Sequence, residues 1–301
     1  MKYLIKMITA ICLLLIIETS FGYAQNYDTV QIRSIKITDN VYMLTGAGGN
    51  MGYCAGDDGG FLVDGEFAPL TEKIKSAAMA INPKPIRYLF NTHVHGDHVG
   101  GNENFAKSGT VIVAHDNIRS RMSTDQFIEL FNRKVPAYPP LALPTITYSD
   151  EMTFHMNGED VHIIHMPNAH TDGDGIVHFV KANVINTGDL FFNGIYPIID
   201  LSSGGSIDGM IAAVDKILSI TNNTTNIIPG HGPLTNPDRL REYRTMLAGV
   251  KDHVQALIKD GKSLGETIAA HPSKDYDSGW GNGFMKPDKF VEIVYKSLTK
   301  K

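Results

Sequence analysis

Short apolar runs alternate with turn residues in the first part of the chain, between residues 31 and 64. The runs cover residues 32–38, 41–45, 51–55 and 61–64, and Gly, Asn and Asp cluster between them. Short runs of β-favouring residues bounded by such turn residues are typical of antiparallel strands. We therefore expect this part of the chain to form a set of antiparallel strands and turns.

From residue 70 onward, the pattern changes to helices that alternate with strands. Apolar positions in residues 70–81 recur at helical spacing, Pro83 and Pro85 end this helix, and residues 86–90 form a continuous apolar run. Such a run is typical of a strand buried on both faces, and residues 111–114 are predicted to form another. Residues 118–131 are predicted to be mostly helical, and residues 136–144 to be a proline-rich loop.

The second half repeats this plan of strands followed by helices. The predicted strands cover residues 145–148, 152–155, 161–165, 176–180, 184–186 and 227–228. The predicted helices cover residues 207–220, 237–258 and 290–298, with a further helix that starts at the capping box formed by Ser263 and Glu266. Two halves of this kind predict an α/β fold in which two sheets pack face to face with helices outside. We expect residues 25–301 to be one domain, because two domains would need a linker that the sequence does not offer.

The first 24 residues are predicted to be a secretory signal peptide. Lys2 and Lys6 precede an apolar run at residues 7–17, which is followed by small residues up to Ala24. This run is too short for a membrane span, which takes about 20 residues in a helix, and an uncleaved membrane anchor is the alternative. We therefore expect a periplasmic or secreted protein with no stable membrane insertion after cleavage.

Composition narrows the possible partners and redox chemistry. The 301 residues include 27 Lys and Arg against 32 Asp and Glu, and 43% are hydrophobic, which excludes a disordered chain. A net charge of −5 without any run of basic residues argues against nucleic acid and leaves a small molecule as the expected partner. Cleavage after residue 24 would leave Cys54 as the only cysteine, so no internal disulfide forms, and we expect Cys54 to be a buried apolar residue.

Three histidines and an aspartate follow the predicted strand at residues 86–90. They are His93, His95, Asp97 and His98, and they lie at a strand end, where α/β proteins place their functional sites. In an extended loop, His93 and His95 project to the same side and can bind one ion together. Imidazole is a preferred ligand of zinc, and a carboxylate adds an oxygen ligand that also orients a bound water. The segment therefore predicts a metal site.

Three further candidate ligands follow other strand-like runs, namely His170, Asp189 and His231. With these residues the chain resembles the metallo-β-lactamase superfamily, whose five motifs correspond here to Asp64, residues 93–98, His170, Asp189 and His231. The resemblance implies a four-layer αββα sandwich of two mixed β-sheets, with the metal site on the edge that the sheets share.

Two zinc ions per chain are implied by the same resemblance. The first would bind His93, His95 and His170, the second would bind Asp97, His98 and His231, and Asp189 would bridge both. Asp97 would also act in catalysis by orienting a metal-bound hydroxide that attacks a carbonyl. Asp64 would fix a ligand histidine, although the residue can also be read as an ordinary turn aspartate before Gly65.

The sequence indicates the substrate less closely than it indicates the metal site. Phe192 stands three residues after Asp189, where zinc β-lactamases of the commonest kind carry a lysine and quorum-quenching lactonases carry a tyrosine. Export and the complete ligand set make an antibiotic-like cyclic amide of the β-lactam type the first candidate, with lactone or thioester hydrolysis as the alternative. An iron enzyme resembling persulfide dioxygenases and a zinc module without catalysis are two further options, which metal content would separate.

Other residues near these motifs are weaker candidates. His165 and His178 flank His170 in sequence and could reach the edge of the site. The aromatic residues Phe191, Phe192, Tyr196 and Trp280 and the pair Pro139 and Pro140 could form pocket walls, with core packing as the more ordinary role of the aromatic residues.

Overall fold

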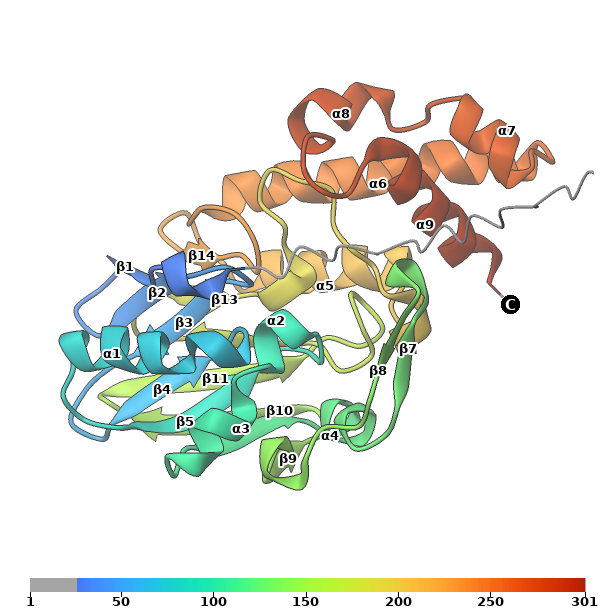
Figure 1. Ribbon diagram of the computed structural model, residues 1–301. Helices are drawn as coiled ribbons and strands as arrows, with labels where there is room; N and C mark the ends of the chain where they lie inside the picture. The colour runs from blue at the N-terminus through green and yellow to red at the C-terminus, as the bar shows by residue number, and fades with distance from the viewer. Residues whose placement is uncertain (1–25, 301) are drawn as a thin grey trace, which may run out of the picture.

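The computed structural model describes residues 26–300 as a layered arrangement of sheets and helices (Figure 1). The predicted signal peptide, residues 1–24, lies outside the described residues. Across residues 26–300, no helix combines the length and the apolar character needed to cross a membrane.

The first sheet has seven strands within the described part of the chain, in the order β1-β2-β3-β4-β5-β6-β9. Their bounds are Arg33–Lys36 (β1), Val41–Thr45 (β2), Met51–Cys54 (β3), Gly60–Val63 (β4), Ile86–Asn91 (β5), Val111–His115 (β6) and Ile146–Tyr148 (β9). Strands β1 to β4 pair antiparallel, whereas β4, β5, β6 and β9 pair parallel. The parallel pairing sets the carboxyl ends of β4 and β5 side by side, so Asp64 and the loop with His93 emerge at the same edge.

The second sheet has five strands among the same residues, in the order β10-β11-β12-β13-β14. Their bounds are Glu151–Met156 (β10), Glu159–His165 (β11), Gly175–Phe179 (β12), Val184–Asn186 (β13) and Asn226–Ile228 (β14). All neighbours pair antiparallel except β13 and β14, which pair parallel. The loops after β13 and β14 therefore leave the sheet together, and they carry Asp189 and His231.

Apolar side chains from both sheets fill the space between them. Phe61 of β4 is fully buried, and its ring centroid lies 5.1 Å from that of Phe154 in β10 and 6.5 Å from that of Phe179 in β12. Val113 of the first sheet and Val177 of the second belong to the same cluster. Burying such side chains stabilises each by about 1.5–3 kcal/mol, so this cluster fixes how the two sheets lie against each other.

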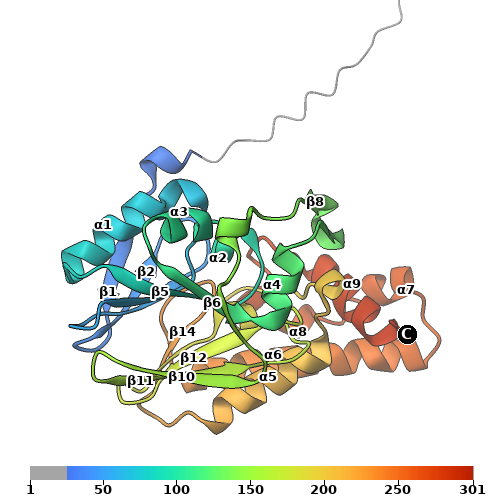
Figure 2. The ribbon, with the colours of Figure 1, turned by 90° about the horizontal axis from the view of Figure 1, so that it is seen from below.

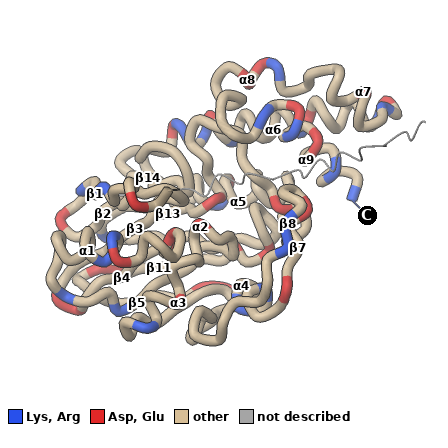
Figure 3. The backbone as a smooth tube through the Cα atoms, in the orientation of Figure 1, with Lys and Arg blue, Asp and Glu red and all other residues tan. Residues whose placement is uncertain are grey.

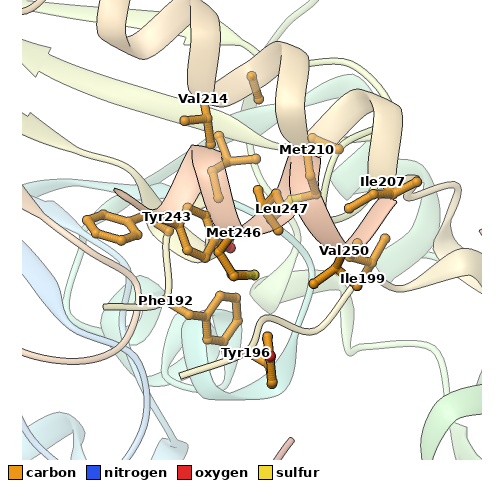
Figure 4. Close-up of a cluster of buried hydrophobic side chains, with 14 of the residues drawn as sticks. Phe192, Tyr196, Ile199, Ile207, Met210, Val214, Tyr243, Met246, Leu247 and Val250 are labelled. Atoms are coloured by element: carbon orange, nitrogen blue, oxygen red, sulfur yellow. The ribbon is translucent and has the colours of Figure 1, made fainter. Parts of the chain in front are cut away.

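Helices cover the outer face of each sheet (Figures 1 and 2). On the first sheet they are α1 (Thr71–Ile81), α2 (Gly96–Val99), α3 (Asn102–Lys107) and α4 (Asp116–Met122), and on the second they are α5 (Ile207–Ser219) and α6 (Pro237–Lys259). The last three helices, α7 (Leu264–Ala269), α8 (Lys274–Trp280) and α9 (Pro287–Thr299), pack on α5 and α6. Met210 of α5 and Leu247 of α6 pack together in the apolar layer that Figure 4 shows. The predicted arrangement of two mixed sheets between helical layers is therefore confirmed.

Residues 118–131, predicted to be mostly helical, contain a helix end and a hairpin instead. Helix α4 ends at Met122, and the chain continues into β7 (Gln126–Ile128) and β8 (Arg133–Val135), which pair antiparallel. Ser123, Thr124 and Asp125 explain the break, because the Ser123 and Thr124 hydroxyls donate to the Ser120 carbonyl at 2.8 and 3.3 Å and the Asp125 carboxylate accepts from the Ala137 backbone amide at 2.9 Å. Short polar side chains that bond in this way compete with helical backbone pairing. The short helices α2, α3 and α8 were also not predicted.

Cys54 is buried and unpaired by any disulfide in the described chain, as expected. Burial raises the pKa of its thiol to about 12, so the sulfur is a protonated packing group at neutral pH.

The Phe61 contacts predict a large effect of truncation. Replacing Phe61 with Ala should lower the free energy of unfolding by about 3–5 kcal/mol, because the substitution leaves a cavity between two rigid sheets. Urea denaturation followed by circular dichroism measures this change. The control, Phe284→Ala, removes a ring that is 57% exposed and should change stability by less than about 0.5 kcal/mol. Equal effects of the two substitutions would contradict the assigned role of Phe61.

Candidate metal centre

The seven predicted ligands lie together at the edge where both sheets end. His93 and His95 lie in the loop after β5, Asp97 and His98 in α2, His170 between β11 and β12, Asp189 after β13, and His231 after β14. Their potential ligand atoms form two groups in which all atoms lie within 4.8 Å of one another. These groups are His93, His95, His170 and Asp189, and Asp97, His98 and His231. The structure thus brings together every residue of the predicted set.

Asp189 lies between the two groups. Its Oδ2 is 3.7 Å from His93 Nε2 and 3.6 Å from His170 Nε2. Its Oδ1 is 3.2 Å from His98 Nε2 and 3.4 Å from His231 Nε2. One carboxylate oxygen therefore faces each group, which is the arrangement that a bridging ligand requires.

Neighbouring acceptors fix the tautomers of two histidines in the first group. The Nδ1 of His170 lies 2.9 Å from the Ile198 carbonyl, which can only accept, so this nitrogen carries the proton. The Thr92 hydroxyl donates its single hydrogen to Asp64 and lies 3.0 Å from His93 Nδ1, so His93 must donate to it. Both Nε2 atoms are consequently left with a bare lone pair, and both face Asp189.

His95 is oriented by Asp200, which sequence reasoning did not single out. His95 Nε2 lies 3.0 Å from a carboxylate oxygen of Asp200 and donates to it, so His95 Nδ1 is the nitrogen that remains for a metal. That nitrogen lies 2.9 Å from the bare Nε2 of His170. Burial would lower the pKa of His95, but Asp200 raises it, so a positive charge is favoured between these two nitrogens, where a metal ion would also fit.

Asp200 is itself held by its own loop. Its Oδ1 accepts hydrogen bonds from the backbone amides of Ser202 and Ser203. Burial alone would raise the pKa of Asp200, but the bonds to His95 and to these groups outweigh it and lower the pKa. In the sequence, Asp200 before Leu201 and Ser202 has only the pattern of a turn cap, and nothing there indicates its contact with His95.

Asp64 holds the second group in the same way. His98 Nδ1 donates to Asp64 Oδ2 at 2.8 Å, and the Thr92 amide donates to Asp64 Oδ1 at 2.8 Å. The backbone of Asp64 has a φ of 64°, a left-handed conformation that aspartate tolerates better than most residues. Asp64 therefore contacts His98, a predicted ligand, and also has the backbone conformation of a turn residue.

Several buried polar atoms at the centre have no hydrogen-bond partner within the described residues. They are His93 Nε2, His98 Nε2 and Asp189 Oδ1. An unpaired buried polar group costs about 1–3 kcal/mol, so three at one point need a common explanation. Nitrogen and carboxylate donors that converge in this way fit zinc or a similar transition metal.

The charge balance of the centre also favours a cation. Burial would raise the pKa of Asp97, but His98 and His231 outweigh it and lower the pKa to about 2. Conversely, burial would lower the pKa of His231, whereas Asp189 and Asp97 raise it to about 10. The two carboxylates thus create a negative potential that draws positive charge onto the site.

The centre opens to solvent on the side of Asp97 and His231, whose side chains are 27% and 26% exposed, whereas the other ligands are buried. Glycines of the loop at residues 46–50 pack on it: a Cβ built on Gly49 would lie 2.2 Å from the His98 ring. Glu66 holds this loop by accepting from the Gly48 amide at 2.7 Å, and Asn50 donates to the carbonyls on both sides of His231. These supporting residues were not predicted.

Most of the weaker candidates lie away from the opening. Phe191, Phe192 and Tyr196 are fully buried and belong to one apolar cluster with residues of α5 and α6, and Figure 4 shows the last two of them. Core packing, their ordinary role, is therefore confirmed. Phe192 nevertheless contacts the site, because its ring stacks on His231 with centroids 5.1 Å apart. His165 stacks on His115 and bonds to the Asp174 backbone, so it contacts none of the ligands in the described structure.

A pocket opens beside His95. Its lining residues are Val94, His95, Gly96, Arg121, Thr124, Gln126, Ile128, Arg133, Val135, Pro136, Tyr138 and Ser203. Pro139 and Pro140, suggested above as walls, do not line it. Their neighbours Pro136 and Tyr138 do, and the other wall is the β7–β8 hairpin.

The family model described as "Metallo-beta-lactamase superfamily" matches residues 44–231, which include all seven predicted ligands. Among curated proteins, an uncharacterized protein of Mycobacterium bovis is 30% identical over 100 residues, 32% of this chain and 44% of its own length. The chain therefore spans less than half the length of the curated relatives that it matches.

Two solved structures illustrate the fold likeness. A metallo-beta-lactamase from Pontibacter korlensis has a TM-score of 0.60 at 16% identity, covering 72% of this chain and 99% of that one. A stereoselective inverting sec-alkylsulfatase from Pseudomonas sp. has a TM-score of 0.64 at 18% identity, covering 88% of this chain and 50% of that one. At identities this low, the structural likeness establishes a shared fold and nothing further.

The Asp200 contact yields a test by substitution. Asp200→Asn keeps the size of the side chain but removes the charge that makes His95 a stronger ligand, so zinc affinity should fall by about 10- to 100-fold. Competition with a chromophoric chelator measures the affinity. Asp215→Asn, which alters a remote ion pair with Arg244, serves as the control and should bind zinc like the wild type. Unchanged affinity in Asp200→Asn would show that His95 does not depend on this carboxylate.

Proposed function

The chain belongs to the metallo-beta-lactamase superfamily of metal-dependent hydrolases, and on this premise we propose that it is an exported two-zinc hydrolase of small carbonyl compounds. The first candidate substrate is a cyclic amide of the β-lactam type. The observation that carries the proposal is the set of imidazoles whose outer nitrogens are held by neighbouring groups, so that their other nitrogens converge around Asp189.

In this proposal, the first zinc ion is held by His93, His95 and His170, and the second by Asp97, His98 and His231, with Asp189 shared between them. When bound, a zinc pair supplies Lewis acidity and activates water as a nucleophile at neutral pH. The donor atoms form two separate groups, and one carboxylate oxygen of Asp189 faces each group. This arrangement supports two ions rather than one. This weighs against the alternative of a single-iron enzyme that resembles persulfide dioxygenases.

The protein's own residues orient the reaction. Asp64, Thr92 and Asp200 hold the imidazoles, so no ligand has to reorganise during the reaction. Asp97 is ionised and partly exposed at the opening, where its carboxylate can accept the proton of the attacking water. In hydrolysis of a cyclic amide, the oxygen of the water forms a bond to the carbonyl carbon, and the bond from that carbon to the amide nitrogen breaks. The proton that Asp97 accepted passes to the leaving nitrogen.

The opening argues for catalysis, because the partly exposed Asp97 and His231 leave an approach for a substrate, which argues against a zinc module without catalysis. Phe192 stacks on His231 and offers neither an ammonium nor a hydroxyl group to a substrate, so it favours neither a β-lactam nor a lactone. The predicted export keeps the cyclic amide first, and lactone and thioester hydrolysis, which use the same attack, are the second candidates. Because an alkylsulfatase shares the fold, sulfate esters belong in the same assay.

Export and partner choice rest on the sequence. The pattern of residues 1–24 supports delivery to the periplasm or the exterior, where a small-molecule substrate such as an antibiotic would be met. The net charge of −5 gives no support for nucleic acid as a partner.

Metal content and hydrolysis test the proposal together. Elemental analysis of the wild type should give about two zinc ions per chain, and His95→Ala should lose the first, because it removes a ligand of that group alone. Hydrolysis of whichever compound the wild type cleaves should fall by about 100-fold or more, since even indirect partners of a metal contribute up to about that factor. The panel is a chromogenic cephalosporin, a homoserine lactone, a thioester and a secondary alkyl sulfate.

His155→Ala, which removes an exposed histidine far from the centre, should keep both zinc and activity. Bound iron with oxygen uptake and no hydrolysis in the wild type would contradict the proposal. Full zinc content in His95→Ala would contradict the ligand assignment.

A further inference from the structure

The β7–β8 hairpin presents two different faces. In its register, Gln126 pairs with Val135, Phe127 with Lys134, and Ile128 with Arg133. The first and third pairs line the pocket beside His95, whereas Phe127 and Lys134 do not. Since side chains alternate across a strand, the hairpin turns one face toward the pocket and the other toward solvent.

The pocket contains two arginines with different surroundings. Arg121 is neutralised, because its guanidinium makes two hydrogen bonds of 2.7 Å to Asp172, and it also donates to Gln126 at the base of the hairpin. Arg133 makes no ion pair with any carboxylate in residues 26–300, and its side chain makes no hydrogen bond there. Figure 3 shows basic positions on this hairpin. The pocket therefore contains one arginine charge that the protein leaves uncompensated.

The pocket lies against the metal centre. His95, a ligand of the first group, is part of its lining, as is the neighbouring Gly96. A Cβ built on Gly96 would lie 3.9 Å from the Tyr138 hydroxyl, so this ring lies over the loop between His95 and Asp97. Arg133 and Asp97 act in opposite directions on the pKa of Tyr138, which burial raises, so both charges lie within electrostatic reach of its hydroxyl.

A guanidinium beside apolar walls has a clear chemical preference. Arginine binds carboxylate, sulfonate and similar anions through paired hydrogen bonds, and Ile128, Val135 and Tyr138 offer apolar surface on either side.

We propose that Arg133 and the inner face of the β7–β8 hairpin form an anion-binding subsite, and that the substrate carries an anionic group on an apolar arm beside its scissile bond. The position of the scissile bond in this inference rests on the proposed function, whereas the binding of the anion by Arg133 does not. Arg133 determines specificity, and Arg121 positions the hairpin.

Two esters of equal length test this specificity on the zinc-loaded protein. The mono-para-nitrophenyl ester of adipate ends in a carboxylate, and para-nitrophenyl hexanoate ends in a methyl group. Arg133→Ala should lower kcat/KM for the adipate ester by about 10- to 100-fold, mainly through KM, because a hydrogen bond to a charged group is lost. It should change the hexanoate value by less than about twofold. Arg133→Lys should restore part of the preference.

Lys134→Ala is the matched control, because it removes the adjacent positive charge from the outer face of the same hairpin. It should leave both esters unaffected. Equal losses on the two esters in Arg133→Ala, or equal effects of Arg133→Ala and Lys134→Ala, would overturn the proposal.

Calorimetry with hexanesulfonate separates this inference from the hydrolase proposal. Sulfonate is a weak zinc ligand, so its binding reports the subsite, and Arg133→Ala should weaken it by at least about tenfold. If the wild type cleaves neither ester but Arg133→Ala still loses hexanesulfonate binding, the subsite stands and esterase-type hydrolysis fails. If the sulfonate binds the wild type and Arg133→Ala equally, or binds neither, the subsite is refuted.

Discussion

The orientation of four imidazoles is the constraint on which the rest of the site depends. His93, His95, His98 and His170 each have one nitrogen that donates to a neighbouring group, so only the other nitrogen remains for a metal. Each of these remaining nitrogens points into a buried space that also contains the carboxylate of Asp189. Such an arrangement is costly in the absence of a cation, since unpaired donors and acceptors lose their hydration without compensation. The fold therefore maintains a site whose stability depends on binding a metal.

The two sheets make this arrangement possible because neither holds the complete set. Parallel pairing of β4 with β5 and of β13 with β14 brings four loop ends to one edge, and the inter-sheet cluster around Phe61 keeps those ends in register. The loop at residues 46–50 then joins the halves directly. The Asn50 amide donates to the Pro229 and Gly232 carbonyls, and the Asn50 backbone donates to Gly230. Helices α5 and α6, with α9 packed on them, stabilise the second sheet from behind.

The sequence predicted the residues that share a local pattern and missed those that act across the fold. His93, His95, Asp97 and His98 were recognisable because they cluster after a buried strand. Asp200 and Asn50 were not recognisable, because their contacts to His95 and to the His231 loop join segments separated by 105 and about 180 residues. The hairpin was mistaken for helix because the bonds that Ser123, Thr124 and Asp125 make from their side chains to the backbone override the apolar spacing there. As a result, Arg133, which lies on that hairpin, could not be assigned to the pocket from the sequence.

Anomalous diffraction from crystals of the zinc-loaded protein, collected at the zinc absorption edge, tests the central claim most directly. The account predicts two peaks at the edge of the sheets. One would lie within bonding distance of His93 Nε2, His95 Nδ1 and His170 Nε2, the other of His98 Nε2, His231 and Asp97, with Asp189 between them. A single peak, or a peak bound to the opposite nitrogen of any of the four constrained histidines, would contradict it.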